Sequence, residues 1–217
     1  MMPENSDPAE FVRFLGTEKA SAILRTPHGD LALPAMESAL RAGFRICEYT
    51  LTIPGAYELI RETASRYPEV VIGAGTVLNK EQAQKSISAG ARFLVSPVVD
   101  IDLIRFAQES NVAIIPGCST PTEMITAHRA GAPLVKLFPA PAGGPSWVQA
   151  VLGPLPELKI VPTSGVTQEN AREFLKAGAH AIGFVAPLFQ PQDIEEQNWD
   201  KIEARGKELL YTCQQVT

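Results

Sequence analysis

Eight short apolar runs recur along the chain, and segments with helical periodicity separate them. Successive runs begin between 20 and 25 residues apart, a distance that holds one strand and one helix. The intervening segments 34–41, 57–67 and 171–176 carry apolar positions at the helical spacing. The pattern predicts eight alternating strand–helix units, with strands at Ala20–Arg25, Arg45–Leu51, Val70–Ala74, Arg92–Ser96, Val112–Pro116, Leu134–Phe138, Lys159–Thr163 and Ala181–Val185.

A longer repeat supports this division of the chain. The dipeptide Ala-Gly ends a helical segment and precedes a strand at residues 42–43, 89–90, 130–131 and 177–178, at intervals of 47, 41 and 47 residues. Glycine just past a helix supplies the left-handed cap that turns the chain toward the next strand. Eight strands with this repetition predict an α/β fold, a single-domain (β/α)8 TIM barrel. An open doubly wound sheet is the alternative, but no Gly-x-Gly-x-x-Gly follows the first strand.

The ends of the chain add two helices to this plan. Asp7-Pro-Ala-Glu10 has the form of a capping box with proline at the first helical position, as does Thr120-Pro-Thr-Glu123. We expect an extra N-terminal helix over Asp7–Phe14 that covers the bottom of the barrel. Trp199–Tyr211 should form the last outer helix. One domain is therefore expected over residues 1–217, with 1–19 as helix and lead-in and 20–217 as barrel.

Composition narrows the choice of partners. A net charge of −5 without a basic cluster argues against a nucleic-acid partner. No apolar stretch approaches the roughly 20 residues of a membrane span, so no membrane association is expected. The N-terminus lacks the basic and apolar regions of a signal peptide. We expect a cytoplasmic protein whose partner is a small molecule.

Cysteines and histidines are few and scattered. Their spacings match no metal-binding motif, and no two histidines stand three or four residues apart. We therefore expect free thiols and no protein-bound metal. The residues concerned are Cys47, Cys118, Cys213, His28, His128 and His180.

One lysine stands out among the eight in the chain. Lys136 lies between Val135 and Leu137 in the apolar run 131–140. Burial of an ammonium is costly, so the pKa of Lys136 should fall. A lysine that is neutral near physiological pH can attack a carbonyl to form a Schiff base. The alternatives are a lysine that reaches solvent from the strand end, or one paired with a buried carboxylate.

A carboxylate inside a second strand complements this lysine. Strand alternation puts Ile46, Glu48 and Thr50 on one face, and a buried carboxylate is uncommon unless it is paired or catalytic. Glu48 could form a structural ion pair with Arg25 or Lys136. It could also move the protons that imine chemistry requires. Together the two residues predict a Schiff-base lyase.

Other polar residues gather at the predicted carboxyl ends of the strands, where active groups of such barrels lie. They are Arg25, Thr50, Thr52, Thr76, Ser96-Pro97, Pro116, Ser119 and Thr163-Ser164-Gly165.

At these residues the chain resembles the KDPG/KHG aldolases, which cleave 2-keto-3-deoxy-6-phosphogluconate or 4-hydroxy-2-oxoglutarate. The resemblance runs from about Ser21 to Phe189. Its most specific segment is Gly131-x-x-x-Val-Lys136-Leu-Phe-Pro-Ala-x-x-x-Gly144. The other matching segments are Gly73-Ala-Gly-Thr76-Val-Leu-Asn79, Ser96-Pro97, Pro116-Gly-x-Ser-Thr-Pro-x-Glu123 and Val161-Pro-Thr163.

The resemblance implies a class I aldolase that needs no cofactor and is a homotrimer. Lys136 would form the imine with pyruvate or the keto acid, and Glu48 would be the general acid/base, acting through a water. Thr76, with Pro97 and Phe138, would hold the pyruvyl group. The products would be pyruvate and either glyceraldehyde 3-phosphate or glyoxylate.

Two departures from the family pattern affect the ends of the substrate. The family's carboxylate-binding arginine is replaced by Thr52, and we expect Arg25 to supply the positive charge. After the seventh and eighth strands the family's glycines bind phosphate through backbone N–H groups. Here Thr163-Ser164-Gly165 and Gly183-Phe-Val-Ala-Pro187 stand instead. We expect Phe184 and Val185 to add bulk at this place, which favours a substrate without phosphate.

Two other functions fit the same barrel less well. A catalytically inactive keto-acid or phosphosugar barrel, acting as a sensor or partner, would explain the altered residues but not the retention of both Lys136 and Glu48. An isomerase or synthase of the kind found in tryptophan biosynthesis would need an intact phosphate site and no lysine imine.

Overall fold

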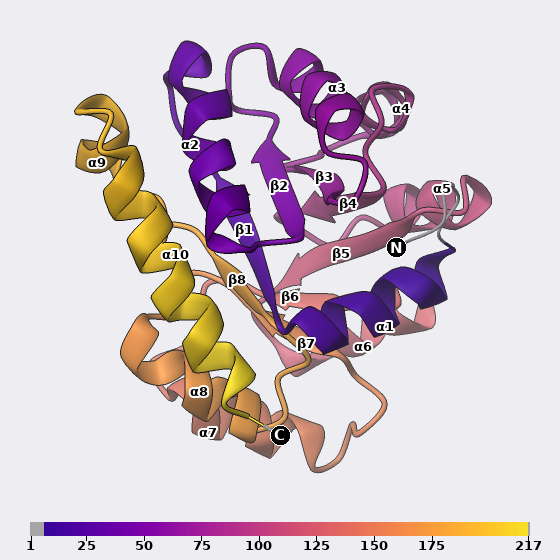
Figure 1. The fold of residues 1–217 in the computed structure, drawn as a ribbon. Helices are drawn as coiled ribbons and strands as arrows, with labels where there is room; N and C mark the ends of the chain where they lie inside the picture. The colour runs from indigo at the N-terminus through magenta and orange to yellow at the C-terminus, as the bar shows by residue number, and fades with distance from the viewer. Residues whose placement is uncertain (1–6, 217) are drawn as a thin grey trace.

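The computed structural model describes residues 7–216, in which eight parallel strands form a barrel (Figure 1). The strand order is β7-β6-β5-β4-β3-β2-β1-β8, and a bridge between Thr163 and Gly183 joins the two ends of the sheet. All eight predicted strands are confirmed to within two residues at each end. The strands are β1 Ala20–Leu24, β2 Ile46–Thr50, β3 Val71–Gly75, β4 Phe93–Ser96, β5 Ala113–Cys118, β6 Val135–Leu137, β7 Ile160–Pro162 and β8 Ile182–Phe184.

A helix follows each strand, and these helices surround the barrel. They are α2 Gly29–Ala42, α3 Ala56–Arg66, α4 Lys80–Ser88, α5 Ile101–Glu109, α6 Pro121–Arg129, α7 Gly144–Leu152, α8 Gln168–Lys176, α9 Pro191–Glu195 and α10 Trp199–Gln214. None of the helices within residues 7–216 is long and apolar enough to cross a membrane. The (β/α)8 prediction is confirmed.

The Ala-Gly repeat has the predicted conformation. Gly43, Gly90, Gly131 and Gly178 have φ of 113°, 106°, 105° and 99°, values that glycine adopts without steric cost. In α2 the N–H of Gly43 donates to the carbonyls of Ala39 and Leu40. The glycine thus ends the helix and directs the chain into β2.

The second helix begins earlier than the segment 34–41 in which the sequence shows helical periodicity. In the structure α2 begins at Gly29 and contains Pro34. Ala32, Ala35 and Met36 of this helix are completely buried. Packing of this apolar face offsets the hydrogen bond that Pro34 cannot donate.

Two separate apolar cores result from the alternation of side chains along the strands. The larger core lies between the strands and the outer helices. The smaller one fills the barrel and consists of Phe11, Val12, Leu15, Ile46, Val71, Phe93, Val95, Ala113, Ile115, Leu134, Val161 and Ala181. The barrel interior is therefore packed with side chains and is not a pore.

The first helix, α1 (Pro8–Glu18), closes the bottom of this interior core. Phe11 stacks on Phe93 with 4.7 Å between ring centroids, and His180 Nε2 lies 2.9 Å from the carbonyl oxygen of Val12. Figure 1 shows α1 beside the start of β1. The predicted N-terminal helix is confirmed, and it extends four residues beyond Phe14, to Glu18.

The two predicted capping boxes form in full at α6 and in one half at α1. Asp7 accepts a hydrogen bond from the N–H of Glu10 at 2.7 Å. At α6 both halves of the capping box form, because Thr120 accepts from the N–H of Glu123 and the Glu123 carboxylate accepts from the N–H of Thr120.

Candidate active site

Lys136 is the central residue of β6 and points into the barrel. Its neighbours in register are Gly117 on β5 and Val161 on β7. The side chain is buried, with 7 % of its residue surface exposed. Its Nζ lies 5.0 Å from the centroid of the Phe138 ring, at the carboxyl end of the same strand. The lysine therefore does not extend into solvent.

Glu48 lies on β2 and, like Lys136, faces the interior of the barrel. It is 2 % exposed and lies in register with Ile23 on β1 and Gly73 on β3. A Cβ built on Gly75 would lie 1.8 Å from Glu48 Oε1. The carboxylate thus occupies the space that any side chain at position 75 would need.

A small cavity inside the barrel brings these two groups together with two hydroxyls. Its polar lining consists of Ser21, Glu48, Lys136 and Thr163, and its volume is about 10 Å³. A cavity of this size and polarity has room for about one water molecule. The cavity lies beneath the lysine, between it and α1.

Neither the Lys136 amine nor the Glu48 carboxylate is held by a hydrogen bond or ion pair within residues 7–216. Every fully enclosed side-chain nitrogen and oxygen in this part of the chain has a partner. The polar atoms of Lys136 and Glu48 must therefore face open space. Because buried polar groups are nearly always hydrogen-bonded, water or a ligand is their expected partner.

Burial dominates the charge states of the pair. It raises the pKa of the Glu48 carboxyl, and the positive charges of Lys136 and Arg25 oppose this in part. It also lowers the pKa of the Lys136 amine, against the attraction of Glu48 and with help from the repulsion of Arg25. Both groups are therefore shifted toward their neutral forms. A neutral amine and a protonated carboxylic acid are a nucleophile and a general acid.

Arg25 and Thr76 meet at the mouth of the barrel above this pair. Arg25 directly follows β1 and is exposed, and its Nη2 donates to Thr76 Oγ1 at 3.2 Å. Thr76 directly follows β3 and has φ of 60°. A β-branched residue rarely adopts this conformation, which costs about 1–3 kcal/mol. Strain of this kind is concentrated at functional sites.

Thr52 does not join that contact. It is exposed, and its Oγ1 lies 2.9 Å from Thr50 Oγ1. Within the described residues its side chain makes no hydrogen bond to Arg25.

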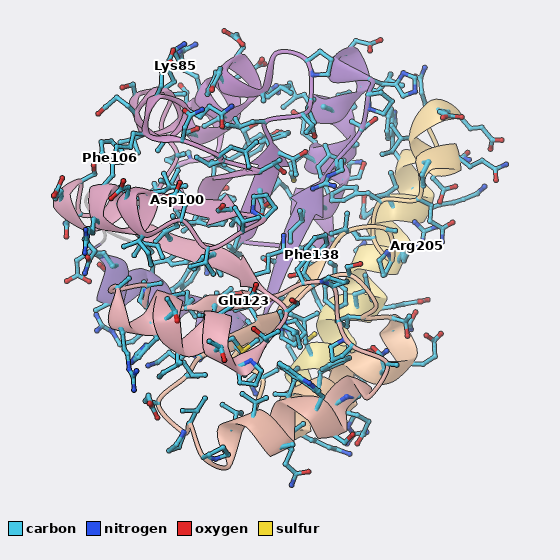
Figure 2. The ribbon with its side chains drawn as sticks, turned by 180° about the vertical axis from the view of Figure 1, so that it is seen from behind. Lys85, Asp100, Phe106, Glu123, Phe138 and Arg205 are labelled. Atoms are coloured by element: carbon cyan, nitrogen blue, oxygen red, sulfur yellow. The ribbon has the colours of Figure 1, made fainter. Side chains whose placement is uncertain are left out.

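Pro97 and Phe138 line a cleft of about 500 Å³ beside the mouth. Gly117 belongs to the same lining, and a Cβ there would lie 2.3 Å from the Pro97 carbonyl oxygen. Glu123, labelled with Phe138 in Figure 2, also faces this cleft. Its carboxylate already accepts hydrogen bonds from Ser119 and Thr120.

The loop between β7 and α8 carries the remaining candidates. Thr163 is buried, whereas Ser164 and Gly165 are exposed and have φ of 49° and 86°. Asn170 holds this loop: its Oδ1 accepts from the N–H of Thr167 at 2.7 Å, and its Nδ2 donates to the carbonyl of Gly165 at 3.0 Å. The first of these contacts uses a backbone N–H, that of Thr167, which could otherwise donate to an anion.

The expected obstruction by Phe184 was wrong. Its ring is completely buried in the outer core and meets Phe44 edge-on, with 6.4 Å between centroids. Since Gly183 faces the barrel interior, the next residue on the strand must face the helices. The bulk of Phe184 therefore lies away from the mouth.

Two residues of the site were not anticipated from the sequence. Gly75 leaves the space for the Glu48 carboxylate, and Ser21 adds a hydroxyl to the cavity. Strand alternation carried a signal for both, because Ser21 shares a face with Arg25, and Gly75 shares a face with Gly73.

Comparison with known proteins assigns the chain to one family. The family model described as KDPG and KHG aldolase matches residues 13–205. The chain belongs to this family. It is therefore an aldolase, a carbon–carbon lyase of the class that acts on 2-keto-3-deoxy acids.

Individual relatives agree with this assignment. The KHG/KDPG aldolase of Escherichia coli K12 is 37 % identical over 180 residues, which cover 82 % of this chain and 84 % of that protein. A KDPG aldolase from Legionella pneumophila, solved with pyruvate captured as a covalent carbinolamine, superimposes with a TM-score of 0.85. It is 27 % identical and covers 94 % of this chain and 98 % of its own.

A third solved structure is a designed cage made by fusing symmetric oligomeric domains. It is 31 % identical with a TM-score of 0.80, over 91 % of this chain and 74 % of its own.

Replacement of Gly75 by alanine tests the position of Glu48. The new Cβ would collide with the carboxylate, and displacement of a catalytic group by about 1 Å can cost about a hundredfold in rate. We expect aldolase turnover to fall by about this factor while the melting temperature changes little. Gly153→Ala is the matched control, because a Cβ there would meet no atom closer than 3.6 Å. If Gly75→Ala turned over at the wild-type rate, the space beside Gly75 would not be needed to position Glu48 for activity.

Proposed function

We propose that the protein is a class I aldolase in which Lys136 forms an imine with a 2-keto acid and Glu48 transfers the protons. The main support for this proposal is the arrangement of Lys136 and Glu48. A buried amine and a buried carboxyl share one cavity, neither has a hydrogen bond or ion pair to another group in residues 7–216, and burial shifts both toward their neutral forms. The pyruvate carbinolamine in the Legionella relative supports the same chemistry.

In the first half of the reaction the neutral amine of Lys136 attacks the ketone carbon of a 4-hydroxy-2-keto acid. The carbinolamine forms after a proton moves from nitrogen to oxygen. Glu48 in its acid form then protonates the hydroxyl, which leaves as water, and a protonated imine remains. The raised pKa of Glu48 keeps a proton available for this step.

In the second half Glu48, now a carboxylate, accepts the proton of the C4 hydroxyl. The C3–C4 bond breaks, its electron pair moves into the iminium, and the aldehyde leaves. Protonation of the resulting enamine at C3, followed by addition of water to the imine, releases pyruvate and regenerates the amine. A water in the 10 Å³ cavity could relay protons between Glu48 and the substrate.

Arg25 is proposed to bind the substrate carboxylate in place of the arginine that the family carries where Thr52 stands. The guanidinium lies at the mouth and is positioned by Thr76. It is close enough to influence the pKa of both Glu48 and Lys136. Pro97 and Phe138 would shape the wall that contacts the pyruvyl group.

The far end of the substrate is proposed to carry no phosphate. In the loop after β7 the N–H of Thr167 is already bonded to Asn170, and Ser164 stands where the family pattern has glycine. Pro187 after β8 lacks an N–H donor. These features favour 4-hydroxy-2-oxoglutarate, which would yield glyoxylate, over 2-keto-3-deoxy-6-phosphogluconate.

We also propose a cytoplasmic homotrimer that works without a cofactor. Relatedness to a cage built from symmetric oligomeric domains supports oligomerisation. A sensor without catalysis is not favoured, because the chain retains Lys136, Glu48 and the cavity between them.

Trapping with sodium borohydride tests the imine. Incubation with pyruvate and the reductant should add a reduced pyruvyl group to Lys136, as measured by intact mass and peptide mapping. Lys136→Met should abolish both the adduct and turnover, because the amine is the nucleophile. Lys159→Met, which removes an exposed lysine, should retain both. An adduct absent from Lys136 in the wild type would disprove the mechanism.

The Arg25→Ala variant tests carboxylate binding. Loss of a charge-assisted hydrogen bond should raise the KM for pyruvate in the condensation direction by about tenfold or more. Arg105→Ala, an exposed arginine on the outer helix α5, should have the wild-type KM. An unchanged KM in Arg25→Ala would exclude this role.

Comparison of two substrates tests the absence of phosphate recognition. We expect a higher kcat/KM for 4-hydroxy-2-oxoglutarate than for 2-keto-3-deoxy-6-phosphogluconate. Ser164→Gly should raise kcat/KM for the phosphorylated substrate only, since glycine lets backbone N–H groups approach an anion. A wild-type preference for the phosphorylated substrate would contradict this proposal.

A further inference from the structure

The floor of the catalytic cavity is formed by a helix that precedes the barrel. Phe11 and Leu15 of α1 line the cavity from below, opposite Lys136 and Glu48. Both apolar side chains are 1 % exposed. The two polar groups on which the chemistry depends therefore have no open route to solvent through this end of the barrel.

The space above this floor is very small. About 10 Å³ remains between α1 and the polar groups, which is room for about one water molecule. Removal of a phenylalanine side chain from the floor would enlarge the space severalfold, because packed cores relax only partly around a deletion. Additional water could then solvate the lysine.

Contacts with three parts of the barrel hold α1 in this position. Phe11 stacks on Phe93 of β4, and the Val12 carbonyl accepts a hydrogen bond from Nε2 of His180, which stands just before β8. Phe14, on the flank of α1, packs against the interior core, and the Arg45 guanidinium lies 5.3 Å from the centroid of the Phe14 ring. Phe14 does not line the cavity, so it offers a matched control on the same helix.

We propose that α1 is a positioning element of the active site, in which Phe11 and Leu15 seal the barrel beneath Lys136 so that the lysine side chain meets one enclosed water instead of bulk solvent. The proposal deepens the proposed role of Lys136 as the nucleophile. It assigns Phe11 an effect on chemistry without contact with the substrate.

Opening of this floor should change the pKa of Lys136 in one direction. Burial is the main cause of the lowered pKa of Lys136, and water admitted through the floor would stabilise the ammonium form. The pKa of Lys136 should then rise. Below that pKa, each unit of increase lowers the neutral fraction of the amine about tenfold. At high pH, where the amine is neutral in any case, the effect should vanish.

The experiment measures the amine directly and needs no aldolase activity. The full-length protein is labelled with trace acetic anhydride over a range of pH, and mass spectrometry of the Lys136 peptide gives the midpoint of its reactivity profile. In Phe11→Ala the midpoint should move to higher pH, and labelling near neutral pH should fall about threefold to tenfold. Phe14→Ala should match the wild type.

Either of two results would overturn the proposal: an unchanged midpoint in Phe11→Ala, or an equal shift in Phe14→Ala, which would indicate general loosening of the helix. If Phe11→Ala does not fold, Phe11→Leu is judged by the same midpoint criterion. The midpoint is used because access to the reagent alters only the amplitude. Since labelling does not require an imine, failure of borohydride trapping in the wild type would count against the proposed function and leave this test intact.

Discussion

The site depends on keeping one amine and one carboxyl, which line the same cavity inside the barrel, out of bulk water. An isolated charge in such a place is very costly, and proteins respond by shifting the group toward its neutral form. In the proposed mechanism this shift makes Lys136 a nucleophile and Glu48 a proton donor. The same burial thus prepares both partners, and neither would be prepared on an exposed strand end. The apolar core inside the barrel, with α1 below it, maintains this exclusion of water.

Glycine is the means by which a narrow barrel accommodates these large side chains. Gly75 leaves space for the Glu48 carboxylate, and Gly73, next to it on the same face, leaves space for the Phe93 ring. Gly183 opens space beside Thr163 and Ile23. In each case a Cβ would overlap the neighbouring side chain, so the large residue and the glycine form one packing unit across adjacent strands. The position of Glu48 therefore constrains which residue can stand on the neighbouring strand.

At the mouth of the barrel, strained backbone conformations position the side chains. Thr76 and Ser164 both hold positive φ, which the surrounding structure must stabilise. This conformation places the Thr76 hydroxyl where it accepts a hydrogen bond from Arg25 across the top of the barrel. Ser164 is placed in a loop whose backbone groups Asn170 already engages. One strained residue thus supports the proposed anion site at Arg25, and the other belongs to a loop held by its own hydrogen bonds.

Periodicity along the chain was sufficient to locate all eight strands, the glycine caps and the N-terminal helix, because local spacing and capping chemistry determine these elements. It was also sufficient to single out Lys136 and Glu48, since a charged residue in an apolar strand is conspicuous without any knowledge of its neighbours.

The alternation of side chains along a strand, however, shows only which residues share a face. It does not show which of the two faces is the interior of the barrel. Phe184 was misplaced for that reason, and only the closing bridge between Thr163 and Gly183 fixes its direction. The contact of Arg25 with Thr76 joins residues 51 positions apart, and the floor beneath Lys136 comes from a helix more than a hundred residues earlier in the chain. Register and closure of the barrel decide such contacts, and these are properties of the packed chain that no single segment contains.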